Sequence, residues 1–159
     1  MASVTLFLFE NARMTDKPIN LKAKAIDFLS RRDYSYSELY NKLKKYSADL
    51  DAIKSVVDEM VSNKYLNEER FIENFIYSKS KKYGSLKVKH LLQAKVSDQE
   101  LVNDIYQQAE IDELAVARHI WERKFKGEVI TNANDRAKQI RFMLSRGFSL
   151  DLILKLLKM

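Results

Sequence analysis

Residues 25–57, AIDFLSRRDYSYSELYNKLKKYSADLDAIKSVV, and residues 74–106, NFIYSKSKKYGSLKVKHLLQAKVSDQELVNDIY, are two copies of one pattern. An offset of 49 residues aligns their apolar positions in type and spacing. The aligned positions are Phe28 with Tyr77, Tyr34 with Tyr83, Leu39 with Val88, Leu43 with Leu92, Ile53 with Val102, and Val56-Val57 with Ile105-Tyr106. Apolar residues fall four apart within a segment, which predicts helices rather than strands.

A third copy follows at an offset of 100 residues from the first. Its aligned positions are Met143 with Leu43, Ile153 with Ile53, and Leu156-Leu157 with Val56-Val57. The first helix of this copy, around residues 117–125, needs a different offset, so we interpret residues 126–134 as a longer link. Each copy is predicted to be three helices joined by short turns.

The repeat predicts an all-α fold of three tandem three-helix units at residues 20–66, 67–111 and 112–159, after an N-terminal extension at residues 1–19. The sequence has only three glycines and one proline, which disfavours a turn-rich sheet protein. Because units of about 45 residues cannot bury their apolar faces alone, we expect them to stack in an elongated, curved arrangement.

Capping residues mark several predicted helix ends. A serine followed three residues later by a glutamate predicts a capping box, in which both side chains bind free amides at a helix start. A glycine after the last turn predicts a left-handed helix end. The predicted capping boxes are Ser35–Glu38 and Ser97–Glu100, the predicted N-cap is Asn67, and the predicted left-handed residue is Gly147.

The residue types needed for common active sites are absent or scattered. The sequence has no cysteine, and its two histidines, His90 and His119, do not form a metal-binding spacing. Its three glycines are far apart, so no glycine-rich phosphate loop is present. We therefore expect no enzyme activity, no metal and no cofactor. The apolar run at residues 4–9 is too short for a membrane helix and lacks the flanks of a secretion signal.

Basic residues are the stronger functional signal. The formal net charge is +6, which favours an acidic partner such as nucleic acid or an acidic protein surface. Residues 79–95 contain six lysines and no acid. The candidate contact residues are Arg31, Arg32, Lys79, Lys81, Lys82, Lys87, Lys89, Lys95, Arg123, Lys124, Arg136, Lys138, Arg141 and Arg146. The competing interpretation is that these side chains only solvate helix surfaces, and Tyr77 and Tyr83 are interpreted as core or helix-edge residues.

Three segments in order resemble the RecX family. They are residues 64–71 (KYLNEERF), residues 80–84 (SKKYG) and residues 140–153 (IRFMLSRGFSLDLI), and the resemblance covers about residues 20–158. The first segment departs from the family pattern because Lys64 stands where a glycine is common and Asn67 where an acid is common. Lys95-Val96 replaces a lysine-glycine pair.

The resemblance implies a cytoplasmic, non-catalytic modulator of the RecA recombinase that lies in the groove of the RecA–DNA filament. Such a protein would hinder ATP hydrolysis, strand exchange and co-protease activity, and would bind single- or double-stranded DNA weakly and without sequence preference. We expect a monomer, because no long heptad seam is left for a dimer. The alternative is a helix-turn-helix DNA-binding protein that reads bases with Arg136, Gln139 and Arg146.

Overall fold

The computed structural model describes residues 18–128 and 130–158, and within these ranges every regular element is an α-helix. The first unit contains α2 (Leu21–Arg31), α3 (Tyr36–Leu43) and α4 (Leu50–Ser62), the second contains α5 (Glu68–Lys79), α6 (Ser85–Gln93) and α7 (Gln99–Gln108), and the third contains α8 (Glu113–Phe125), α9 (Ala133–Ser145) and α10 (Leu150–Leu157). The predicted all-α fold is confirmed. The apolar run at residues 4–9 lies outside the described residues, as does most of the predicted N-terminal extension.

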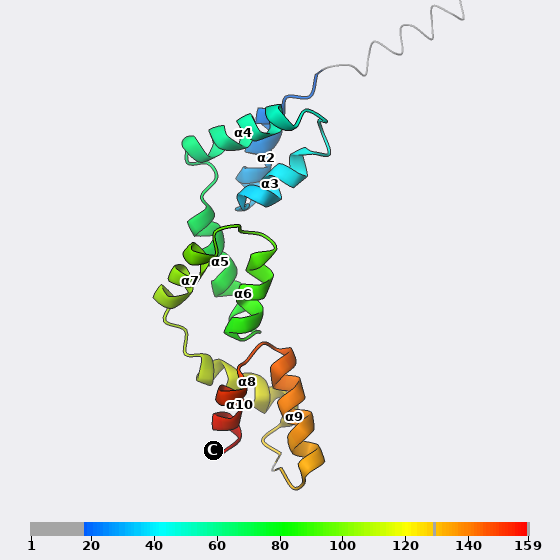
Figure 1. Cartoon of the computed structure of the whole chain (residues 1–159), viewed down its shortest axis with the longest axis vertical. Helices are drawn as coiled ribbons and strands as arrows, with labels where there is room; N and C mark the ends of the chain where they lie inside the picture. The colour runs from blue at the N-terminus through cyan, green and yellow to red at the C-terminus, as the bar shows by residue number, and fades with distance from the viewer. Residues whose placement is uncertain (1–17, 129, 159) are drawn as a thin grey trace, which may run out of the picture.

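Each unit has a hydrophobic core of its own. The three clusters of buried side chains do not share members, and the helices of each unit pack chiefly on one another. Figure 1 shows the units following one another along the longest axis, with the middle unit set to one side of the outer two. The chain is the predicted elongated, curved row, but the expected reason is wrong: each unit buries its apolar stripes in its own core rather than against its neighbours. The contacts between units decide how their surfaces combine.

The burial of equivalent positions confirms the repeat in the second and third helices of the units. All of these side chains are at most 1% exposed: Leu39, Leu43, Ile53, Val88, Leu92, Val102, Met143 and Ile153. They form one apolar stripe on each helix, as helical periodicity requires. Burying these stripes against one another is the main stabilisation of each unit.

Three aligned pairs were wrong by one residue. Tyr77 is 70% exposed, whereas Ile76, one residue earlier, is 1% exposed and fills the core position of Phe28. The cause is the link between the first two helices, which is one residue longer in the second unit (residues 80–84) than in the first (residues 32–35). In the third helices, the inward residue is Val57 in the first unit, but it is Ile105, not Tyr106, in the second and Leu156, not Leu157, in the third. A helix accepts either spacing, because residues three and four apart share a face.

Three of the predicted cap residues are confirmed, but neither predicted capping box is complete among the described residues. Ser35 Oγ accepts from the backbone N–H of Glu38, and Asn67 Oδ1 accepts from the backbone N–H of Arg70. Gly147 follows the end of α9 with φ of +88°. However, the N-cap of α7 is Asp98 rather than Ser97, and its carboxylate accepts from the amide of Leu101. Asp98 lies 49 residues after Asp49, the N-cap of α4, so the repeat itself carries this cap.

One hydrogen bond occurs at both joints between units. At each joint, the first helix of the later unit begins with a glutamate. The carboxylate of this glutamate accepts a hydrogen bond from a backbone amide of the preceding unit, which is the amide of the first residue of that unit's second helix. At the first joint Glu68 Oε1 lies 3.0 Å from the Tyr36 nitrogen, and at the second Glu113 Oε1 lies 2.7 Å from the Ser85 nitrogen. The first amides of a helix have no partner within it, and its dipole favours a carboxylate there.

Beyond this shared contact, the first joint is held by ion pairs. Asp33 accepts from Arg70 Nη2 at 2.6 Å and from Asn74 at 2.9 Å. Glu38 accepts from Lys95 Nζ at 2.5 Å and from Arg32 at 3.1 Å, so it does not complete the predicted capping box. Burial alone would raise the pKa of Glu38, but the hydrogen bonds and charges of Lys95 and Arg32 outweigh it and hold this pKa below its ordinary value of 4.5.

The second joint is held by backbone hydrogen bonds. The amide of Gly84 donates to the carbonyl of Arg146 at 2.8 Å, and the amide of Leu86 donates to the carbonyl of Gly147 at 3.2 Å. A side chain at Gly84 would overlap the backbone of Gly147, and one at Gly147 would lie 2.6 Å from the backbone nitrogen of Lys87. The two glycines therefore permit an approach of α6 to the end of α9 that no other residue allows.

Gly147→Ala should destabilise the chain more than Gly127→Ala. Both glycines have positive φ, at +88° and +70°, so each alanine bears a backbone strain of about 1 kcal/mol. Only Gly147 meets a neighbour, since no atom of the described residues lies within 4 Å of a side chain at Gly127. We expect Gly147→Ala to lower the free energy of unfolding by about 1–3 kcal/mol more than Gly127→Ala does. Urea denaturation measures this difference, and equal losses would contradict the close approach.

Glu38 should make stability depend on acid. Because its pKa is lowered by folding, its contribution is present above its ordinary pKa and is lost as the pH falls through the lowered native value. Glu38→Gln should cost about 1–2 kcal/mol at pH 7 and reduce the loss of stability on acidification. Glu69→Gln is the control, because Glu69 is exposed. The measurement is the denaturation midpoint of each variant between pH 7 and pH 3. The account is contradicted if the midpoints of both variants depend on pH as those of the unsubstituted chain do.

Candidate functional site

A cleft between the second and third units collects basic side chains that are far apart in the sequence. Its volume is about 350 Å³. It is lined by Lys81 and Lys82 of the second unit and by His119, Ile120, Arg123, Lys124, Phe142 and Arg146 of the third. We call it the basic cleft. Five of the fourteen predicted contact residues line it, and they come from the lysine-rich stretch at residues 79–95, from α8 and from the end of α9.

Helix C-termini position these cations. Lys81 and Lys82 follow Ser80, the C-cap of α5. The last turn of α8 contains Arg123 and Lys124, and Arg146 is the C-cap of α9. The free carbonyls at the end of a helix carry partial negative charge and stabilise cations there. The cleft is thus built where three helix ends meet, and the second joint fixes their positions.

None of the described residues that line the basic cleft is acidic. Within the described ranges, none of its five cations forms an ion pair with an acidic side chain. Lys124 and Arg146 instead lie over the ring of Phe142, at 5.6 and 5.3 Å from its centre. Unpaired cations in a concave surface focus a positive potential. The cleft can therefore bind an anionic group, such as a phosphate or a carboxylate.

Three other residues of the lysine-rich stretch contact aromatic rings outside the cleft. Lys87 lies 4.5 Å from the centre of the Tyr83 ring and donates to the carbonyl of Ser145 at 3.3 Å. The ammonium of Lys89 lies 5.1 Å from the Tyr106 ring, and that of Lys79 lies 5.8 Å from the Phe75 ring. Lys87 thus supports the second joint, and all three side chains are partly covered. Tyr83 is half-buried, as expected for a helix-edge residue, whereas Tyr77 lies on the surface.

The predicted residues near the first joint already have partners. Arg32 and Lys95 share Glu38, and Arg32 also covers the Tyr34 ring at 3.6 Å. Arg31 pairs with Asp27 one helical turn away. These cations contribute less to binding a partner, because a new anion must compete with an existing one.

The remaining predicted residues lie on the third unit but outside the basic cleft. Arg136 lines a separate cavity of about 650 Å³ that also contains Glu122 and Glu128. Lys138 lines a smaller cavity beside Asp135 and Gln139, and Arg141 is exposed. Of the four predicted residues from 136 to 146, only Arg146 therefore reaches the basic cleft.

Gln139 is not placed to read a base. It is 4% exposed, and its Oε1 accepts from the indole N–H of Trp121 at 2.7 Å. If the buried side-chain amide of Gln139 turned outward, the indole N–H of Trp121 would lose its hydrogen-bond partner. This removes one of the three residues on which the helix-turn-helix alternative depends.

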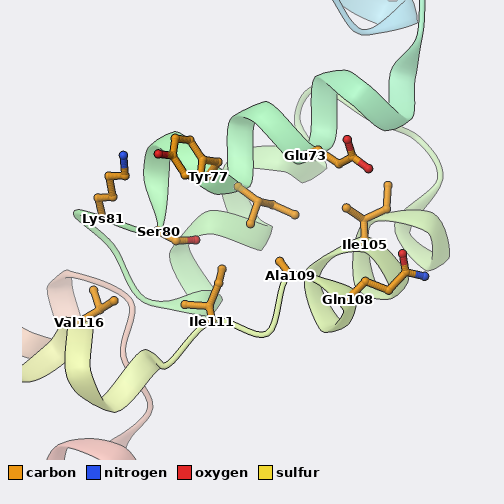
Figure 2. A pocket seen from close by; sticks show the side chains of 10 residues that line it. Glu73, Tyr77, Ser80, Lys81, Ile105, Gln108, Ala109, Ile111 and Val116 are labelled. Carbon is orange, nitrogen blue, oxygen red and sulfur yellow. The ribbon is translucent and has the colours of Figure 1, made fainter.

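Sequence reasoning missed the members of this region that are neither lysine nor arginine. His119, Ile120 and Phe142 line the basic cleft, although only their cationic neighbours were predicted. A larger, mostly apolar pocket of about 510 Å³ opens nearby, between α5, α7 and the start of α8 (Figure 2). Periodicity identifies residues that face a core but not cavities between units, so no sequence signal marks either set.

The described residues contain no group of three or more side chains of metal-binding type. Across residues 18–128 and 130–158, no helix is both long enough and apolar enough to span a membrane.

Comparisons with known proteins agree over most of the chain. Residues 22–60 match the first three-helix domain of RecX, and residues 110–157 match the third. Proteins named regulatory protein RecX are similar to this chain: that of Acinetobacter baylyi is 38% identical, over 85% of this chain and 84% of its own length, and that of Herminiimonas arsenicoxydans is 35% identical, over 86% and 89%. The crystal structure of RecX from Lactobacillus salivarius has the same fold, with a TM-score of 0.73 at 17% identity, over 87% of this chain and 92% of that one. The chain therefore belongs to the RecX family of regulatory proteins.

Proposed function

We propose that this chain regulates RecA by binding along the groove of the RecA–DNA filament, where it lowers ATP hydrolysis, strand exchange and co-protease activity. Membership of the RecX family indicates that the chain is a regulatory protein. The observation that carries the proposal is the basic cleft, in which cations of two units form one anion-binding surface. The action is by binding alone, without catalysis, metal or cofactor.

An elongated row suits a partner that repeats along an axis. Each unit has its own core, so each can present a separate surface to successive parts of a filament. Several modest contacts on one chain combine into a strong attachment when the joints hold them at the right spacing. We include in this proposal the division into units 20–66, 67–111 and 112–159, a monomeric state and a cytoplasmic location.

Contact with DNA in the filament is a secondary part of the proposal. The net charge of +6 and the five cations of the cleft support weak, sequence-independent attraction to single- or double-stranded DNA. The burial of Gln139 against Trp121 disfavours a separate role as a sequence-specific DNA-binding protein. Among the predicted contact residues, we assign the leading role to those of the basic cleft.

The proposal predicts inhibition of RecA ATP hydrolysis on single-stranded DNA at fewer than one chain per RecA. Lys82→Glu together with Lys124→Glu should raise the concentration needed for half-inhibition at least about tenfold, since two cations of one cleft become anions. The control is Lys45→Glu with Lys155→Glu, which changes the charge equally at exposed positions outside the cleft. Equal loss in both double variants would contradict the role of the cleft. No inhibition by the unsubstituted, folded chain would contradict the proposed function itself.

A further inference from the structure

The pocket beside the basic cleft has apolar walls that come from two units. Ile76 and Ile105 line it from the second unit, Val116 lines it from α8, and Ile111 lies in the link between them. Ala109, at the end of α7, leaves the space open because its side chain is only a methyl group (Figure 2). At about 510 Å³ the pocket has room for a large apolar side chain with its neighbours.

A buried hydroxyl group lines this pocket. Ser80 is 6% exposed, and its Oγ has no hydrogen-bond partner within residues 18–128 and 130–158. The hydroxyl of Tyr106 lies close to it and is also buried, but no hydrogen bond of ordinary length and angle joins the two. Buried polar groups rarely stay unpaired in a native protein, so the backbone of a peptide that enters the pocket can supply the partner that the Ser80 hydroxyl lacks.

The apolar pocket and the basic cleft share one residue. Lys81 lines both, so the two cavities adjoin at its side chain. Figure 2 shows Lys81 and Tyr77 at one end of the pocket and Glu73 at the other. Cations therefore continue from one end of the pocket into the cleft, while the opposite end carries a negative charge. A ligand with an apolar part and an anionic part is oriented by this difference.

We propose that the pocket and the cleft together form one docking surface for an acidic protein segment, with an apolar side chain in the pocket and carboxylates in the cleft. This proposal rests on the proposed function, because it takes the basic cleft to be the surface that binds the protein regulated by this chain. It adds the chemistry of that partner: an apolar residue next to several aspartates or glutamates. Charge complementarity fixes the direction, with the acidic part on the Lys81 side.

The aromatic rings near the cleft favour a protein segment over a bare nucleic acid. Bases of single strands bind by stacking on open ring faces. The ring of Phe142 is covered by Lys124 and Arg146, and Lys81 lies 3.9 Å from the centre of the Tyr77 ring. A phosphate backbone would fill the cleft and leave the apolar pocket empty. An apolar side chain fills the pocket and removes its walls from water.

The test uses the full chain and three fluorescent probes. Two are twelve-residue peptides with the same aspartates and glutamates, one with a leucine before them and one with a serine in its place. The third is a single-stranded oligonucleotide. Ala109→Phe fills the pocket, and Ala115→Phe is the control, because Ala115 is an exposed alanine of α8 outside every cavity described above. Gln108→Trp is a second filling variant at an exposed lining position, for use if Ala109→Phe lowers the melting temperature.

The unsubstituted chain should bind the leucine peptide about 10- to 100-fold more tightly than the serine peptide, as expected for burial of one leucine side chain. Ala109→Phe should abolish this preference and Ala115→Phe should retain it. Lys81→Glu should weaken the binding of both peptides. Equal affinity for the two peptides, or the same loss in both phenylalanine variants, would overturn the proposal. A parallel loss of oligonucleotide binding in Ala109→Phe would also overturn it, by assigning the pocket to nucleic acid. Because these assays contain no RecA, their outcome is separate from that of the ATP hydrolysis assay.

Discussion

Two carboxylates, those of Glu68 and Glu113, fix how the three units follow one another. Each begins the first helix of its unit and accepts from the first amide of the second helix of the unit before, Tyr36 or Ser85. The contact uses groups that every helix start supplies, namely free amides and a dipole that favours negative charge. Because each unit has its own core, these joints rather than a shared hydrophobic interior determine the shape of the chain.

The two joints differ in what surrounds this common contact, and the difference bears on function. Ion pairs around Asp33 and Glu38 hold the first joint and consume Arg32 and Lys95. The second joint depends on Gly84 and Gly147, whose backbones meet directly, and so leaves the nearby cations unpaired. Surface charge is therefore neutralised at one joint and kept available at the other, which is where the basic cleft and the apolar pocket lie.

The sequence predicted the helices well because the repeat encodes local features. Apolar stripes such as that of Leu43 and its equivalents follow from the helical period, and Ser35 and Asn67 cap helices through bonds to residues close in the chain. Lys64 shows where local patterns stop being sufficient. It stands where the family commonly has glycine, and it adopts φ of +59°, so the turn keeps its left-handed form despite the substitution.

The candidate site was predicted only in part, because its geometry depends on the second joint. The sequence marked the cations of residues 79–95 but gave no means to separate Lys81 and Lys82, which reach the basic cleft, from Lys95, which pairs with Glu38 across the first joint. Charge counting likewise could not show that Gln139 is buried by Trp121. These outcomes are decided by contacts between units, for which the chain carries no periodic signal.

The central claim is that cations of two units act as one site because the second joint holds them together. A double-mutant cycle on the affinity for RecA–DNA filaments tests it, with Lys82→Met in the second unit, Arg123→Met in the third, and both together. The account predicts that the losses are not additive and that the coupling free energy is about 1 kcal/mol or more. Losses that add within about 0.3–0.5 kcal/mol would show that the two residues bind independently, and would contradict the account.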